Sequence, residues 1–404
     1  MSPRIALFLA GCAAFLNLYA TQGLLNELAG AFQVSARQAG WSITVTTLAV
    51  AITAPFVGRL TAGAAQHRVI ALAAMLLALP AVLAAWASGF SEFLFWRSVQ
   101  GMLIPVVFAT SVAYIGVRWS GGAVSEVTSV YVAGTILGGF CGRFLTGLVT
   151  EYADWRLALT LLGALSLVMG ALILWLLPRN PVLPTPVSVD RAVTAGELWR
   201  RPLLAAYAVG FCVLFSQVAT FTYAGLHLSQ APFSLGSGAL GTIYAVFLLA
   251  LVVIPIAGRL SKARPQGELV KIAAWLGVTG SLLTLSPALW LIVLGLALSS
   301  TGVFLAQAAA NAFTTSHARY NKAGAVGLYL TSYYLGGSFG AWVPGALWEQ
   351  WGWPGCVALI VVFQLLSLFV AWTCWKPALL PALPTVASTP LNTLDSPSNK
   401  EKVR

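Results

Sequence analysis

The chain has 404 residues, of which 59% are hydrophobic and only 8% are charged. Soluble domains carry about 25% charged residues, so this composition excludes an ordinary soluble protein and indicates a protein embedded in a lipid bilayer. The formal net charge of +11 does not indicate a nucleic-acid partner, because the basic residues lie between apolar segments and not in one patch.

Apolar stretches of membrane-spanning length follow one another along the chain. A transmembrane helix needs about 20 mostly apolar residues, and this length predicts about twelve such helices. They cover residues 5–25, 39–57, 69–87, 93–117, 127–149, 156–177, 203–226, 237–257, 268–286, 288–313, 323–346 and 355–374. The first stretch ends on Tyr19, Gln22 and Asn26 without a small-residue cleavage site, so we expect a retained span and not a signal peptide.

A polar, proline-rich segment divides these stretches into two equal groups. We therefore predict an all-α polytopic membrane protein with an N-terminal six-helix bundle at 1–178 and a C-terminal six-helix bundle at 203–376. A cytoplasmic linker at 179–202 would join the two bundles. The remainder, 377–404, is rich in Pro, Ser, Thr and Asn, and we expect a disordered cytoplasmic tail there.

The second group repeats the first at an offset of about 200 residues. The segment APFVGRLT at 54–61 returns as IPIAGRLS at 254–261, and LGGFCG at 137–142 returns as LGGSFG at 335–340. Duplicated halves in so hydrophobic a chain are typical of transporters, in which the substrate path lies at the boundary between the halves. The sequence therefore predicts two pseudo-symmetric bundles.

The distribution of basic residues predicts the orientation in the membrane. If the N-terminus is cytoplasmic and the spans alternate, nearly all lysines and arginines fall on the cytoplasmic side, and only Arg37 and Arg156 fall outside. Cytoplasmic loops of membrane proteins carry this excess of basic residues. We therefore expect both termini in the cytoplasm.

Cysteines and histidines give no sign of a metal or catalytic centre. The 5 cysteines lie mostly within predicted spans, where they suit packing, and the 3 histidines fall in or near separate loops. The sequence contains no metal-ligand spacing and no Ser-His-Asp or Cys-His arrangement. We expect no metal, no cofactor and no enzymatic activity, and a duplicated single chain disfavours a channel built from a ring of subunits.

Two arginines, Arg97 in the fourth span and Arg143 in the fifth, lie well inside predicted spans, and no acidic residue does. A charge at the bilayer centre costs about 2.5–3.5 kcal/mol, so each must face water, a substrate or another partner. Arg97 is interpreted either as a switch or anion-binding group, or as a donor to backbone carbonyls. Arg143 is interpreted either as an outer gate paired with Glu27 or Glu151, or as a substrate contact.

Polar residues at helical spacing within the spans predict the substrate path. Arg97 and Gln100 share one helical face, as do Gln307 and Asn311. Such groups turn toward a bundle interior or a wet cavity, although some only join helices at about 0.6 kcal/mol each. The full predicted set is Tyr19, Gln22, Asn26, Arg97, Gln100, Gln217, Gln307, Asn311 and Tyr333.

Glycine runs predict close approach between helices. The fifth span carries Gly134, Gly138, Gly139 and Gly142, and the eleventh carries Gly336, Gly337 and Gly340. One interpretation is a sliding contact between the two halves, and the other is close packing without motion.

Three motifs together resemble the major facilitator superfamily, over nearly the whole chain up to about residue 376. Gly58-Arg59-Leu60-Thr61 is similar to the start of that family's loop between spans two and three. Arg97-x2-Gln100-Gly101 is similar to its fourth-span arginine motif, and the fifth-span glycines followed by Trp155-Arg156 are similar to its antiporter motif. The pattern most resembles the twelve-span drug:proton antiporters and arabinose-efflux-type permeases of bacterial inner membranes.

The resemblance implies alternating access by two rocking bundles, a coupling role for Arg97, a monomer in the lipid bilayer of the bacterial inner membrane, and protons as a second partner. We expect a secondary active transporter for a small-molecule substrate, with proton-coupled efflux of a drug-like or anionic metabolite as the leading hypothesis. The alternative is an importer or facilitator of an organic anion, which the absence of an acidic residue inside the spans favours.

Overall fold

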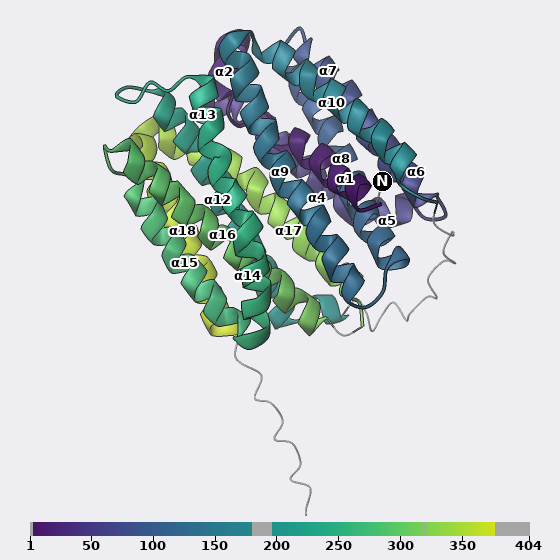
Figure 1. The fold of residues 1–404 in the computed structure, drawn as a ribbon. Coiled ribbons are helices and arrows are strands. Elements are labelled where there is room, and N and C mark those ends of the chain that lie inside the picture. The colour runs from purple at the N-terminus through teal and green to yellow at the C-terminus, as the bar shows by residue number, and fades with distance from the viewer. Residues whose placement is uncertain (1–2, 180–195, 319, 376–404) are drawn as a thin grey trace, which may run out of the picture.

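The structure is a computed structural model that describes residues 3–179, 196–318 and 320–375. Helices make up the regular structure of these residues (Figure 1). Most of the predicted linker, 179–202, and all of the predicted tail, 377–404, lie outside the described residues.

The first half is a bundle of helices in antiparallel and parallel contact. Its elements are α1 (Pro3–Leu18), α2 (Leu25–Phe32), α3 (Ala36–Ala39), α4 (Trp41–Thr53), η1 (Ala54–Phe56), α5 (Val57–Leu60), α6 (Gln66–Leu76), α7 (Ala78–Ala85), α8 (Phe90–Arg118), α9 (Gly122–Tyr152) and α10 (Trp155–Leu176).

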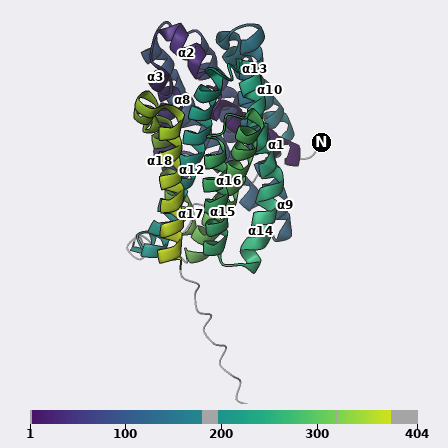
Figure 2. The same cartoon turned by 90° about the vertical axis from the view of Figure 1, so that its left-hand side faces the viewer.

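The second half repeats this arrangement. Its elements are α12 (Arg201–Ser229), α13 (Ser237–Ile243), η2 (Tyr244–Leu249), α14 (Ala250–Ala263), α15 (Gln266–Leu283), α16 (Leu289–His317), α17 (Lys322–Trp342) and α18 (Pro344–Cys374). The long helices run between two ends of the molecule (Figures 1 and 2). We call the end that carries α2 and α13 the upper end, and the opposite end the lower end.

Among the described residues, 9 helical segments are long and apolar enough to cross a membrane. The all-helical, multi-pass prediction is therefore confirmed. The count of twelve spans stays a prediction, because α1, α15 and α17 are not among these segments. The first predicted span, 5–25, is interrupted: α1 ends at Leu18 and has only 16 residues. At 1.5 Å per residue it is about 24 Å long, which is shorter than the hydrocarbon core of about 30 Å.

The repeated glycines bring two parallel helices together within each half. In the first half the glycines of α9 lie against the backbone of α1, and in the second half those of α17 lie against α12. A Cβ atom on Gly138 would lie 2.5 Å from the carbonyl oxygen of Cys12, and one on Gly340 would lie 2.5 Å from that of Phe215. The pairs are Gly134–Phe8, Gly138–Cys12, Gly142–Leu16, Gly336–Phe211 and Gly340–Phe215.

The glycines at these positions lie in helix–helix contacts within one half, so the interpretation as a sliding contact between the halves is wrong. The partners lie in the same half because the backbones there approach too closely for any side chain. Gly139 and Gly337 lie outside these backbone contacts: a Cβ on Gly139 would lie 3.5 Å from Arg143 Nη1, and one on Gly337 would lie 2.8 Å from Leu214 Cδ2.

Two symmetry-related helix pairs carry most of the contact between the halves. Helix α4 packs against α17, and α9 packs against α13 and η2. The pairs correspond because 237–257 repeats the region of α4, and α17 repeats that of α9. The boundary between the halves therefore has the two-fold character that the sequence repeat predicts.

Candidate functional site

The predicted site is built around a break in the first span. After α1 ends at Leu18, the chain turns, and the Gln22 amide donates to the Tyr19 carbonyl at 3.0 Å and the Leu24 amide to the Thr21 carbonyl at 3.0 Å. Helix α2 starts at Leu25. The last carbonyls of a helix that ends inside a bundle need donors from elsewhere.

Arg97 of α8 supplies these donors. Its Nη1 atom donates to the Asn17 carbonyl at 3.1 Å and its Nη2 atom to the Leu18 carbonyl at 3.0 Å, and the residue is only 1% exposed. A cation at a helix C-terminus also interacts favourably with the helix dipole. The geometry therefore agrees with the interpretation of Arg97 as a donor to backbone carbonyls.

A buried polar network holds Arg97 in place within the first half. Gln100 accepts from Arg97 Nη1 and donates from Nε2 to Asn17 Oδ1 at 2.7 Å. Asn17 in turn donates to Ser166 Oγ of α10 at 2.8 Å. The structure thus brings together the predicted pair Arg97 and Gln100, but it buries them inside one half. The coupling role of Arg97 stays a prediction.

Arg143 lies at the boundary between the halves. Its Nε atom donates to Gln22 Oε1 at 2.7 Å, and its Nη1 atom donates to the Gly139 carbonyl at 2.6 Å. Gln22 continues across the boundary, where its Nε2 atom donates to Thr222 Oγ1 of α12 at 2.9 Å. One hydrogen-bonded chain therefore links Arg143 of the first half to the second half.

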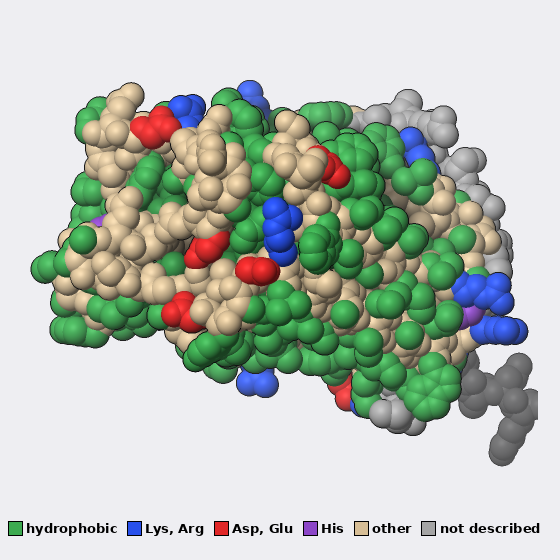
Figure 3. All heavy atoms as spheres, turned by 90° about the horizontal axis from the view of Figure 1, so that it is seen from above, with side chains coloured by type: hydrophobic (Ala, Val, Ile, Leu, Met, Phe, Trp, Pro, Cys, Tyr) green, Lys and Arg blue, Asp and Glu red, His purple; other side chains and the backbone are tan. Residues whose placement is uncertain are grey.

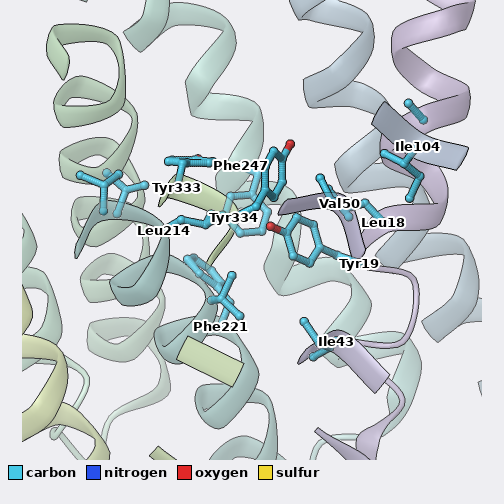
Figure 4. Packing of buried hydrophobic residues seen from close by; sticks show 14 of the residues in the cluster. Leu18, Tyr19, Ile43, Val50, Ile104, Leu214, Phe221, Phe247, Tyr333 and Tyr334 are labelled. Atoms are coloured by element: carbon cyan, nitrogen blue, oxygen red, sulfur yellow. The ribbon is translucent and has the colours of Figure 1, made fainter. Parts of the chain in front are cut away.

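Aromatic rings from both halves surround the Arg143 guanidinium. Its Cζ atom lies 4.5 Å from the centre of the Tyr19 ring, 4.8 Å from that of Phe247 and 5.2 Å from that of Tyr244. Guanidinium groups are attracted to ring faces within about 6 Å. We call Arg143, Gln22, Tyr19, Tyr244 and Phe247 the Arg143 cage. Tyr19 and Phe247 lie in one cluster with Tyr334 and Phe221 in Figure 4.

The predicted ion pair of Arg143 with Glu27 or Glu151 is wrong for this conformation. Glu27 accepts from the Ser237 hydroxyl, and Glu151 accepts from the Gly238 amide at 3.1 Å. Glu151 is eight residues from Arg143 along α9, which at 1.5 Å per residue is about 12 Å toward the upper end. Both carboxylates therefore join the halves at the start of α13, above the Arg143 cage.

Other contacts between the halves also lie toward the upper end. Asn26 donates to Ser229 Oγ at 2.5 Å, and the Ser338 hydroxyl donates to the Thr44 carbonyl at 3.0 Å. Arg37 of α3 forms an ion pair with Glu349 of α18 at 3.2 Å. Acidic and basic side chains accordingly lie side by side on the upper face (Figure 3). In the parts of the chain that the structure describes, no hydrogen bond joins the halves at the lower end.

The remaining predicted path residues do not form one group. Tyr333 of α17 packs against Tyr334, with ring centres 5.5 Å apart, and Gln307 of α16 lies beside its hydroxyl. Gln217 is partly buried in α12, whereas Asn311 is exposed near the lower end of α16. The structure therefore brings Tyr19 and Gln22 to Arg143, keeps Gln307 with Tyr333, and leaves Asn26 and Asn311 outside both groups.

Tyr244 and Phe247 were not among the predicted site residues. Aromatic residues in spans usually serve packing or interfacial anchoring, so their type alone gives no signal. The repeat does give one, because at its offset Tyr244 and Phe247 correspond to Thr44 and Thr47 of α4. Thr44 contacts α17 of the other half, and the equivalent Tyr244 faces Arg143 of α9.

Comparisons with known proteins agree with the fold. The family model of the Major Facilitator Superfamily matches residues 7–341. The chain is 29% identical over 374 residues to the inner membrane transport protein YnfM of Escherichia coli (strain K12), covering 92% of this chain and 89% of YnfM.

Two solved structures have the same fold at low sequence identity. A bacterial homologue of the human lysosomal transporter Spinster, inward-facing and unoccupied, superposes with a TM-score of 0.74 at 14% identity, covering 93% of this chain and 98% of that one. A variant of the nucleoside transporter NupG superposes with a TM-score of 0.76 at 12% identity, covering 93% and 100%. The chain thus belongs to the major facilitator superfamily and is a multi-pass membrane transporter.

Proposed function

We propose that the protein moves a small drug-like or anionic metabolite across the bacterial inner membrane by alternating access, with proton-coupled efflux as its mode. The observation that carries the proposal is the uneven contact between the halves. The described hydrogen bonds between them lie toward the upper end and not toward the lower end. Two rigid bundles joined at one end are the arrangement that alternating access requires.

The distribution of charge supports a cytoplasmic lower end. Helix ends at the lower end carry Arg59, Arg68, Arg118, Arg201, Arg259 and Lys322, whereas those at the upper end carry Arg37 and Arg156. Excess basic charge marks the cytoplasmic side. With this orientation both termini are cytoplasmic, and the described conformation is closed toward the outside.

Glu27 and Glu151 fit the role of an outer gate. Both accept hydrogen bonds across the boundary, and a hydrogen bond to a charged group contributes about 1.5–3 kcal/mol when shielded from water. Because both carboxylates lie near the surface, solvent screening puts their contribution at or below the lower end of that range. The two hydrogen bonds across the boundary therefore favour the outward-closed conformation.

The second candidate is a facilitator or importer of an organic anion. The specific observation in its favour is that Arg143, buried at the boundary, has no acidic partner among the described residues. In addition, the interior of the predicted spans contains no carboxylate to which a transported proton would bind.

Proton movement in everted membrane vesicles separates the two candidates. A pH-sensitive dye would report the proton gradient while drugs and organic anions are added one at a time. Proton-coupled efflux predicts that at least one compound collapses the gradient in vesicles with the protein and not in vesicles without it. Saturable tracer uptake of an anion with no change in the gradient would reject coupling and establish the facilitator. Absence of transport for every compound would contradict both.

A further inference from the structure

We infer that the Arg143 cage is a binding site for a substrate that carries one negative charge next to a flat apolar ring, such as an aromatic monocarboxylate. The inference rests on the transport function proposed above and names the class of substrate that would be carried. Four observations lead to it: the buried charge of Arg143, the donor of Arg143 that makes no hydrogen bond, the origin of the rings around Arg143, and the enclosure of Arg97 within the first half.

The Arg143 charge has no counter-charge. Arg143 is only 5% exposed, and the acidic residues of the upper end are engaged elsewhere, Glu27 with Ser237 and Glu151 with Gly238. A buried cation is costly unless it is paired with an anion, and neutral acceptors and rings compensate only part of that cost. An anion arriving from solution would therefore gain more at this position than elsewhere on the boundary.

Arg143 also keeps a donor for such an anion. Its Nε and Nη1 atoms are used by Gln22 and Gly139, whereas Nη2 makes no hydrogen bond to any residue that the structure describes. The Gln22 contact is to a neutral side chain on the unwound segment after α1, and a carboxylate is the stronger acceptor for a guanidinium. A bound carboxylate could thus take Nη2 directly and displace Gln22 from Nε.

The rings around Arg143 indicate that the ligand carries a flat apolar group next to its negative charge. Tyr19 belongs to the first half, and Tyr244 and Phe247 belong to the second. A flat ligand that stacks on them would contact both halves at once. Rocking of the halves would separate these rings, so the affinity of the ligand must differ between the two conformations, as transport requires.

Arg97 is not available for the same purpose. Its Nη1 and Nη2 atoms donate to two carbonyls at the end of α1 and to Gln100, all within the first half, and its Nε atom is buried there without a partner among the described residues. A ligand at the boundary therefore does not reach the Arg97 guanidinium, which is 1% exposed. Because the Arg143 guanidinium carries a single positive charge, a bound monoanion leaves the Arg143 cage with no net charge. A neutral ligand would leave the buried positive charge uncompensated, and a dianion would leave a buried negative charge.

Binding to purified full-length protein tests the assignment. The probes are benzoate, 1-naphthoate and indole-3-acetate, each compared with its neutral amide, and phthalate as a dianion. In the unchanged protein we expect at least one acid to bind about tenfold or more tightly than its amide, as a charge-assisted hydrogen bond implies. Arg143→Gln should reduce that preference to about twofold or less, and Phe247→Leu should weaken acid and amide alike.

Arg156→Gln is the matched control, because Arg156 also contacts a carbonyl and an aromatic ring but lies on α10, away from the boundary. It should keep the acid preference. If Arg143→Gln does not fold, Arg143→Lys and Phe247→Leu carry the test, with Arg143→Lys expected to retain part of the preference. Equal binding of acids and amides by the unchanged protein, or an acid preference that Arg143→Gln leaves intact, would overturn the inference.

Transport measurements distinguish failure of this inference from failure of the proposed function. Transport of a neutral or cationic compound that Arg143→Gln leaves intact would overturn the anion site and keep the transporter. Arg143-dependent binding of an acid without transport of any compound would support the site and contradict the proposed function.

Discussion

The glycine contacts between α1 and α9 make a quantitative prediction about stability. Replacing Gly138 with Ala adds one methyl group at a point where a Cβ atom would lie 2.5 Å from the Cys12 carbonyl oxygen and 2.6 Å from the Cys12 Cα atom. Neither atom can move away alone, because both belong to the backbone of α1. The two helices must therefore move apart by about 1 Å to restore ordinary contact.

The cost of this displacement follows from the packing. Overpacking by one methyl group costs about 1–3 kcal/mol when neighbours cannot relax. The contacts at Gly134 and Gly142 would loosen with the same movement, since they lie one turn away on the same face. We therefore expect Gly138→Ala to lower the free energy of unfolding by about 1–3 kcal/mol. Gly336→Ala should have an effect of similar size, because it faces the α12 backbone in the same way.

Reversible unfolding in mixed detergent micelles, followed by tryptophan fluorescence, measures the effect. Gly116→Ala in α8 is the control, because a Cβ there would meet no atom within 4 Å. It should be neutral or stabilising by up to about 1 kcal/mol, since alanine is the better helix former. Equal stability of Gly138→Ala and Gly116→Ala would refute the assigned packing of α1 on α9.

Further substitutions test the contacts of Arg97 with the end of α1 and the outer gate. Arg97→Gln should lower the free energy of unfolding by about 2–4 kcal/mol, because two carbonyls at the end of α1 lose their donors, and Ser98→Ala beside it should be nearly neutral. Arg37→Gln breaks an exposed ion pair and should change stability by less than about 1 kcal/mol. It should also increase the rate at which a membrane-impermeant maleimide labels the cysteine of Ala341→Cys, since Ala341 is buried at the upper end with its carbonyl near Gly40 of the first half. Glu27→Gln should increase the same labelling rate, because Glu27 contacts Ser237 of the other half. Glu92→Gln should not increase it, because the partner of Glu92, Ser88, lies in the same half. A labelling rate that Glu27→Gln leaves unchanged would contradict the assignment of Glu27 to the gate.

The architecture could be predicted from the sequence because its signals are strong and local. Long apolar stretches determine the helices, and the repeated segments at 54–61 and 254–261 determine the duplication. The glycine spacing predicted close helix packing in α9 and α17. It could not predict the partner, because a glycine face has the same sequence whether it meets α1 of its own half or a helix of the other half.

The site was predicted only in part, for a physical reason. Arg97 and Arg143 stood out because charge within a span is rare, and polar spacing identified Gln22 and Gln100. The partners depend on where α1 ends, since Arg97 meets the last carbonyls of that helix and Arg143 meets the turn beyond it. A break after Leu18 has no proline or glycine at its start, so only the three-dimensional packing locates it.

Paired distance measurements across the two ends test the central claim, which is that the halves rock about the boundary that holds the Arg143 cage. Spin labels at Tyr152 and Trp351 would report the upper end, and labels at Leu60 and Tyr320 the lower end; all four side chains are exposed. We expect a transported compound or a pH step to lengthen the upper distance in the same molecules in which the lower distance shortens. Distances that stay fixed, or that lengthen together at both ends, would contradict it.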